Sequence, residues 1–152
     1  MRPIRLSLQA FGPFATTEVV DFRSALETGL FGIYGQTGAG KSTLFSAMSF
    51  ALFGAPTKTD QEPRSLRSDH SAPDLPTEVE FVFELGAKTY LIRRRPAQER
   101  PKARGEGTTD DAAEASLFDV TGIPVETLGP SQSGRVIEEK KVSVVGREVE
   151  AL

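Results

Sequence analysis

The stretch GQTGAGKST, residues 35–43, constrains the fold of this chain more than any other feature. It matches the pattern G-x-x-x-x-G-K-[S/T], in which glycines let the backbone curl so that successive N–H groups point inward and form an anion-binding nest. A helix that begins near Lys41 adds the positive end of its dipole at the same place. The pattern therefore predicts a phosphate-binding loop between a strand and a helix.

Two side chains of this loop have distinct expected roles toward a nucleoside triphosphate. The Lys41 ammonium neutralises the β- and γ-phosphates and is the candidate catalytic group, and the Ser42 hydroxyl is the candidate Mg²⁺ ligand. No NKxD-type guanine motif is found, which favours ATP over GTP. The candidate nucleotide-binding residues are Gly35, Gln36, Thr37, Gly38, Ala39, Gly40, Lys41, Ser42 and Thr43.

The periodicity of the flanking residues supports this interpretation. Residues 30–34 form a short apolar run, typical of a strand buried on both faces. After the loop, apolar residues recur at helical spacing, and Gly54 with Pro56 predicts the end of that helix. The residues at this spacing are Leu44, Ala47, Met48, Ala51 and Leu52, and we also interpret Phe45, Phe50 and Phe53 as core residues.

Strict alternation predicts antiparallel strands on both sides of the loop and helix. In residues 4–10, apolar side chains alternate with polar ones, and residues 18–22 form a second strand that makes a hairpin with the first. Residues 78–95 predict another hairpin, turning at Gly86-Ala87. The side chains expected on one face of the first strand are Ile4, Leu6, Leu8 and Ala10.

The remaining segments carry weaker signals. Residues 96–114 are rich in proline, glycine and charge, which predicts a mobile loop. A short helical turn is expected near residues 64–68, an edge strand at 116–120 and a helix at the end of 137–152. Together these elements predict a single α/β domain over residues 1–152 with an antiparallel β portion.

Composition limits the classes of function. The chain has 152 residues, no cysteine and one histidine, which excludes disulfides, thiolate metal sites and histidine clusters. Its formal net charge is −3, so the total indicates no general affinity for nucleic acid. No signal peptide or membrane-length apolar stretch is visible. We therefore expect a soluble, cytoplasmic protein that has no membrane partner.

The N-terminal arrangement resembles the SbcC family of DNA-repair ATPases, which are related to structural-maintenance-of-chromosomes proteins. The likeness lies in IRLSLQAFGPF (4–14), VVDF (19–22) and GLFGIYGQTGAGKSTLFSAMSFALFG (29–54), followed by RSLRSD (64–69) and the hairpin EVEFVFELGAKTYLIRR. The likeness covers most of the chain and is looser after residue 96.

This resemblance implies the N-terminal lobe of an ABC-type head, a P-loop NTPase fold, with ATP and Mg²⁺ as cofactors. In that family a C-terminal lobe completes the head, and a long antiparallel coiled coil lies between the two lobes in the chain. Two such heads form a homodimer around two ATP molecules. The heads bind an SbcD-type nuclease subunit, and the complex processes double-stranded DNA ends and hairpins in break repair.

This sequence departs from the full family pattern. It has no Q-loop glutamine in the family's context, no LSGG-like signature, no Walker B Asp-Glu and no long heptad region. We therefore expect the segment by itself to bind ATP poorly and to hydrolyse almost none. Two alternatives remain open: a RecF- or RecN-like DNA-repair ATPase lobe, and a truncated nucleotide-binding module without turnover.

Several other residues allow both a functional and a structural interpretation. The basic run 93–104 either contacts DNA phosphates or is a solvated loop, and charge runs are more often the latter. Arg64 and Arg67 either lie near the nucleotide or the dimer contact, as the resemblance implies, or are exposed loop arginines. Phe11 and Phe14 either contact the base or, more often, pack in a core. We assign no chemistry to His70.

Overall fold

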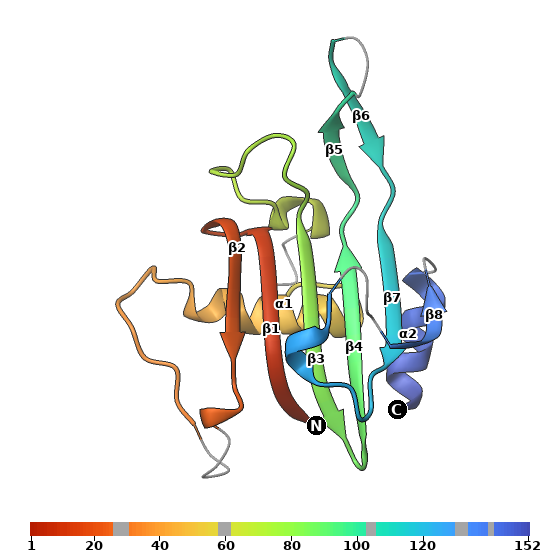
Figure 1. Ribbon diagram of the computed structural model, residues 1–152. Helices are drawn as coiled ribbons and strands as arrows, with labels where there is room; N and C mark the ends of the chain where they lie inside the picture. The colour runs from red at the N-terminus through yellow and green to blue at the C-terminus, as the bar shows by residue number, and fades with distance from the viewer. Residues whose placement is uncertain (26–30, 58–61, 103–105, 130–133, 140–141) are drawn as a thin grey trace.

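A six-stranded antiparallel sheet carries two helices on one face in the computed structural model of the chain (Figure 1). The structure describes residues 1–25, 31–57, 62–102, 106–129, 134–139 and 142–152. The strand order is β2-β1-β3-β4-β7-β8, and β5 and β6 form a separate two-stranded ribbon. The strands are β1 (Arg2–Phe11), β2 (Phe14–Asp21), β3 (Glu78–Leu85), β4 (Lys88–Arg95), β5 (Gln98–Pro101), β6 (Thr108–Asp111), β7 (Glu114–Asp119) and β8 (Arg135–Glu139). The helices are α1 (Lys41–Phe53) and α2 (Val142–Ala151), with short 3₁₀ turns η2 (Pro63–Leu66) and η3 (Val125–Thr127).

Both predicted hairpins are confirmed. The strands β1 and β2 pair antiparallel across the Gly12-Pro13 turn, and β3 pairs with β4. In β3 the alternation holds as expected, because Val79, Phe81 and Phe83 lie in the core that faces the helices. The helical segments expected near residue 64 and at the end of the chain are also found, as η2 and α2.

The first strand departs from strict alternation at Ile4. Leu6 and Leu8 lie in the core under the helices, but Ile4 lies in the core of the opposite face with Val82. The register with β3 shifts between Pro3 and Arg5. An extra residue in one strand moves the side chain to the other face, so the prediction that Ile4 shares a side with Leu6 was wrong.

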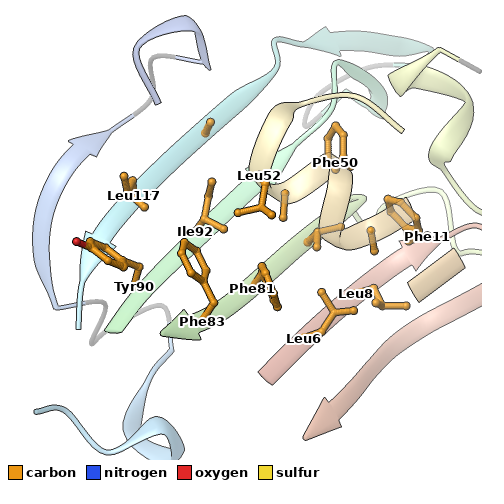
Figure 2. Close-up of a cluster of buried hydrophobic side chains, with 14 of the residues drawn as sticks. Leu6, Leu8, Phe11, Phe50, Leu52, Phe81, Phe83, Tyr90, Ile92 and Leu117 are labelled. Atoms are coloured by element: carbon orange, nitrogen blue, oxygen red, sulfur yellow. The ribbon is translucent and has the colours of Figure 1, made fainter. Parts of the chain in front are cut away.

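The main core lies between the sheet and the helices (Figure 2). Helix α1 packs across β1, β3 and β4, and α2 packs against β7 and α1. Phe50 meets Phe11 with ring centroids 6.2 Å apart. Phe50 is therefore a core residue as predicted, and it ties the helix that follows the glycine loop to the end of β1.

A smaller core covers the second face of the sheet. Val82, Leu91 and Phe118 point to this face, where Leu128 of the segment around η3 covers them. Arg5 Nη1 donates a hydrogen bond of 2.8 Å to the Val125 carbonyl and thereby holds this segment on the sheet. Both faces of the central strands are covered by packed segments. The sheet therefore supports α1, whose first turn directly follows the glycine loop.

Two predictions about the second half of the chain were wrong. The composition of residues 96–114 predicts a loop, but β5 and β6 pair within this segment, with Arg100 opposite Thr109. The predicted edge strand at 116–120 is β7, which lies inside the sheet between β4 and β8. The polar composition of this segment gave no indication of the ribbon, because short strands that lie mostly at the surface need no apolar alternation.

The three consecutive arginines of β4 lie on alternate faces of the sheet. Arg93 and Arg95 face Glu80 and Glu78, which stand opposite them on β3, and the Arg93 Nε–Glu80 Oε1 distance is 2.6 Å. Arg94 points to the helix side, where it is 2% exposed. Cross-strand ion pairs therefore neutralise two of the arginines, and the third is a core residue.

Acid lowers stability in part through Asp21, at the end of β2. The side chain of Arg23 donates hydrogen bonds to this carboxylate, with Nε 3.0 Å from Oδ1, and these lower the pKa of Asp21 to about 2. A carboxyl whose pKa is lowered in the folded state stabilises that state above its unfolded pKa of about 3.9. This contribution disappears as the pH falls from about 4 to about 2.

We therefore expect Asp21→Asn to reduce the loss of stability over this pH window. The measurement is the denaturant midpoint of the wild type and the variant at several pH values. Arg23→Gln removes the donor and should reduce the pH dependence in the same direction. Equal pH dependence in the wild type and Asp21→Asn would contradict the assignment.

Candidate phosphate-binding site

The residues before the glycine loop do not form the strand that the sequence predicts. Residues 31–36 have no regular structure, and Leu30 lies outside the described residues. Tyr34 is 93% exposed. An apolar run becomes a strand only where another strand supplies hydrogen-bond partners, and none of the described strands pairs with this segment.

The glycine loop leads directly into the first turn of α1. Gly38 and Gly40 have φ of 87° and 82°, in the left-handed region that glycine adopts without strain. The carbonyl of Gly40 accepts hydrogen bonds from the N–H groups of Thr43 (3.0 Å) and Leu44 (3.3 Å). The N–H groups of Lys41 and Ser42 lie in the first turn, where a helix has no internal acceptors for its donors.

The predicted nest is therefore only partly free to receive an anion. The sequence predicts that every N–H from Gly38 to Thr43 faces the phosphates. In the structure Thr43 already donates to Gly40, and Ala39 donates to the Gln36 carbonyl at 3.2 Å. The N–H groups of Lys41 and Ser42, in the first turn of α1, are among the candidate backbone ligands that remain.

The Lys41 side chain folds back over the loop. Its Nζ donates to the carbonyls of Gly35 (2.8 Å) and Gln36 (2.7 Å). An ammonium has three N–H donors, so one remains for a ligand. Lys41 therefore holds a positive charge at the mouth of the loop and also ties the start of the loop to the start of α1.

A cavity of about 260 Å³ lies over this helix N-terminus. Its lining consists of Pro13, Thr37, Gly38, Gly40, Lys41, Ser42 and Thr43. A cavity of this size is a candidate site for phosphate groups. The donor set is suitable for phosphate because it joins backbone N–H groups with an ammonium.

The Ser42 hydroxyl suits Mg²⁺, which is a hard cation that binds oxygen. Magnesium in nucleotide sites takes one or two protein oxygens and completes its six ligands with phosphates and water. Ser42 is exposed and lines the cavity beside Lys41. Its position fits the predicted metal ligand.

A larger cavity lies elsewhere. It measures about 530 Å³, lies at the opposite end of α1 and includes Phe50, Gly54, Arg94 and Val142 in its lining. Arg94 donates to the carbonyls of Ala51 and Leu52 there, so it caps the helix C-terminus. Since the candidate phosphate-binding donors are at the other end of α1, the smaller cavity is the candidate site.

The predicted accessory residues have mainly structural contacts. Arg67 Nη1 donates to the Leu75 carbonyl (2.7 Å) and Nη2 to that of Ala72 (2.8 Å), which shapes the following loop. Arg64 is exposed and pairs with Asp110 of the ribbon at 3.2 Å. The structure brings neither guanidinium into the lining of the loop cavity.

Among the described residues of the basic run 93–104, the arginines do not form one cationic patch. Arg93, Arg95 and Arg100 each face a carboxylate, with Arg100 Nε 2.7 Å from Asp111 Oδ1. Arg94 is buried, and Arg104 lies outside the described residues. The solvated-surface interpretation therefore accounts for this run better than a DNA contact does.

The phenylalanines divide between the core and the surface. Phe11 is a core residue, and Phe14 is half-buried against the same core. Phe45 and Phe53 are 55% and 60% exposed, so the prediction that they are core residues was wrong. They lie on the side of α1 away from the sheet, where the described part of the chain leaves them uncovered. His70 is exposed, as expected.

The turn between β1 and β2 packs directly on the glycine loop, a contact that the sequence-based suggestion of a base-contacting role for Phe11 and Phe14 did not include. A Cβ placed on Gly12 would lie 2.8 Å from Thr43 Cγ2, and one on Gly40 would lie 2.6 Å from Phe14 Cζ. The Gly12-Pro13 pair signals only a turn. Nothing in its spacing indicates which distant element packs on it.

The fold and the site together define a P-loop nucleotide-binding domain of the α/β class. The chain matches the family model described as an AAA domain over residues 5–139, and it belongs to this family. No helix in the described part of the chain is long and apolar enough to span a membrane.

Comparison with individual proteins identifies a more specific similarity than the family model does. The chain is 48% identical over 117 residues to the C subunit of the SbcCD nuclease of Vibrio cholerae. It is 44% identical over 117 residues to the protein of the same name from Lactococcus lactis and 45% identical over 95 residues to that from Treponema pallidum. The first two alignments cover 77% of this chain but only 12% and 11% of the relatives. The resemblance to the SbcC family is confirmed, and the chain corresponds to about a tenth of those proteins' length.

Proposed function

We propose that this chain is the ATP-binding lobe of an SbcC-type ATPase that drives nuclease processing of DNA ends and hairpins in double-strand break repair. The observation that carries the proposal is the placement of Lys41, Ser42 and the left-handed Gly38 and Gly40 at the N-terminus of α1. The names of the similar proteins supply the nuclease context and favour this over a RecF- or RecN-like protein.

In this proposal the residues of the loop bind and orient the triphosphate. The N–H groups at the start of α1 hold phosphate oxygens, and the Lys41 ammonium neutralises charge between the β- and γ-phosphates. The Ser42 hydroxyl holds Mg²⁺, which supplies charge neutralisation across the phosphates when bound. The other residues of the loop form the backbone around these groups, and they are Gly35, Gln36, Thr37, Ala39 and Thr43.

The proposal assigns the missing parts of the reaction to other segments and chains. A C-terminal lobe would cover the exposed apolar side of α1, where Phe45 and Phe53 lie, and the exposed Tyr34. A homodimer of complete heads would supply the groups that activate water. An SbcD-type nuclease subunit and DNA would be the partners, in the cytoplasm, a reducing compartment that suits a chain without cysteine.

The test is ATP binding and hydrolysis by the polypeptide as its own cells produce it. We expect Mg²⁺–ATP binding by equilibrium dialysis, and hydrolysis that requires a C-terminal lobe in the same or an added polypeptide. If ATP binds neither with nor without the C-terminal lobe, the proposal is rejected. Binding without hydrolysis, even after a C-terminal lobe is added, would instead support a nucleotide-binding module without turnover.

Ser42→Ala should remove the contribution of Mg²⁺ to ATP binding. We expect the affinity in EDTA to stay close to that of the wild type, and the affinity in Mg²⁺ to fall about 10-fold, because one of the metal's few protein oxygens is lost. Ser49→Ala is a matched control on the same helix, since its hydroxyl donates to the Ala55 carbonyl at 3.0 Å. An equal loss in EDTA and Mg²⁺ would contradict a metal role for Ser42.

A further inference from the structure

The β1–β2 turn and the phosphate loop interlock through two glycines. The Phe14 ring lies against Gly40, so close that a Cβ there would be 2.6 Å from Phe14 Cζ and 3.3 Å from Pro13 Cγ. On the other side, the methyl group of Thr43 fills the space that a Cβ on Gly12 would occupy, 2.8 Å away. The turn and the loop thus each have a glycine that packs against a side chain of the other.

Both glycines also have a positive φ, 55° at Gly12 and 82° at Gly40. Gly40 is the N-cap of α1, and its conformation sets the direction of the N–H groups that follow. No side chain of the described residues caps this helix end with a hydrogen bond. The first-turn N–H groups therefore receive no side-chain acceptor there, while Phe14 packs against the N-cap residue itself.

Hydrogen bonds and core packing hold the β1–β2 turn itself in place. The Gly12 N–H donates to the Leu66 carbonyl at 2.8 Å, and the Ser68 N–H donates to the Ala10 carbonyl at 2.9 Å. Phe11, one residue before the turn, is 1% exposed and packs on Phe50 of α1. The β1–β2 turn, which packs on the phosphate loop, is therefore anchored by two backbone hydrogen bonds and a buried phenylalanine.

We infer that Phe14 is a positioning residue for phosphate binding, which holds Gly40 and the first turn of α1 in the conformation that receives the anion. This inference rests on the proposed nucleotide site. A loop that is ordered before binding loses less conformational entropy when the ligand arrives, so the benefit of the contact appears in affinity. Phe14 touches the loop backbone and needs no contact with the nucleotide.

The test compares Phe14→Ala and Phe14→Leu with the wild type in the full polypeptide. We expect the ATP dissociation constant to rise about 10-fold in Phe14→Ala, as the ordering of the loop shifts into the binding step, and by less in Phe14→Leu, which keeps part of the apolar volume. Amide hydrogen exchange of the segment 38–43 should become faster in Phe14→Ala without nucleotide. Val19→Ala, exposed on β2, is the control for the strand.

Hydrogen exchange separates positioning from a general loss of stability. A merely structural role would accelerate exchange throughout the sheet and leave the affinity unchanged well below the unfolding temperature. Unchanged affinity in Phe14→Ala, with normal binding by the wild type, would overturn the inference alone. Failure of the wild type to bind ATP would instead reject the proposed function.

A second pair of variants tests the interlock from the other side. Gly12→Ala should weaken ATP binding, because its Cβ meets the Thr43 methyl group and its φ becomes strained. Thr43→Ser removes that methyl group and keeps the hydroxyl. We expect the double variant to recover part of the affinity that Gly12→Ala loses. Strictly additive losses would contradict a direct contact between the turn and the loop.

Discussion

Lys41→Ala is expected to weaken ATP binding by about 100-fold or more, because it removes a cation that would make charge-assisted hydrogen bonds to the phosphates. In the structure, Nζ lies within hydrogen-bond distance of the Gly35 and Gln36 carbonyls, at the mouth of the loop. The same change also releases these two carbonyls, so the start of the loop loses its tie to α1. Both effects weaken ATP binding.

The measurement is the dissociation constant for Mg²⁺–ATP, together with the free energy of unfolding. Since the bonds of Lys41 are exposed, we expect the stability to change by less than about 1 kcal/mol. Lys88→Ala, in the turn region of the β3–β4 hairpin, removes the same charge far from the loop and should leave the affinity unaltered. Unchanged affinity in Lys41→Ala would refute the assignment of the site.

Arg94→Ala is expected to give the largest loss of stability, about 2–4 kcal/mol, because it leaves polar groups unpaired and opens a void in the core. Arg94 Nε donates to the Ala51 carbonyl at 2.9 Å and Nη2 to the Leu52 carbonyl at 3.3 Å. Burial lowers the pKa of Arg94 to about 10, so it stays charged at neutral pH. The negative end of the α1 dipole and these carbonyls stabilise that charge.

Three variants separate the parts of this effect in denaturant unfolding. Arg94→Met keeps most of the side-chain volume but not the hydrogen bonds, so it should lose less stability than Arg94→Ala. Arg95→Ala, next in sequence but on the other face, removes only a half-exposed ion pair with Glu78, worth about 1 kcal/mol or less. Equal losses in Arg94→Ala and Arg95→Ala would contradict the distinct role of Arg94.

Predictions from local sequence patterns were correct where the residues that a segment contacts lie close to it in the sequence. The hairpins at β1–β2 and β3–β4 and the end of α1 at Gly54 follow from short-range alternation, turn residues and a left-handed glycine. The position of the phosphate loop follows from glycines that act on their own backbone. These features need no knowledge of the rest of the chain.

Predictions failed where the environment comes from a distant element. Residues 31–34 are apolar, but no described strand pairs with them. Phe45 and Phe53 continue the apolar character of α1, although the sheet covers only the other side of the helix. The ribbon of β5 and β6 was missed because its strands are exposed and carry no apolar period.

The sequence by itself determined the position of the glycine loop, its lysine and serine, and the helix that follows them, because these depend on spacing and on backbone freedom within one short segment. Only the tertiary structure decided that Arg94 is buried while Arg93 and Arg95 pair with glutamates, and that Phe14 lies on Gly40. These outcomes depend on which strand or turn is brought against each residue. Long-range packing sets that choice, and no local pattern records it.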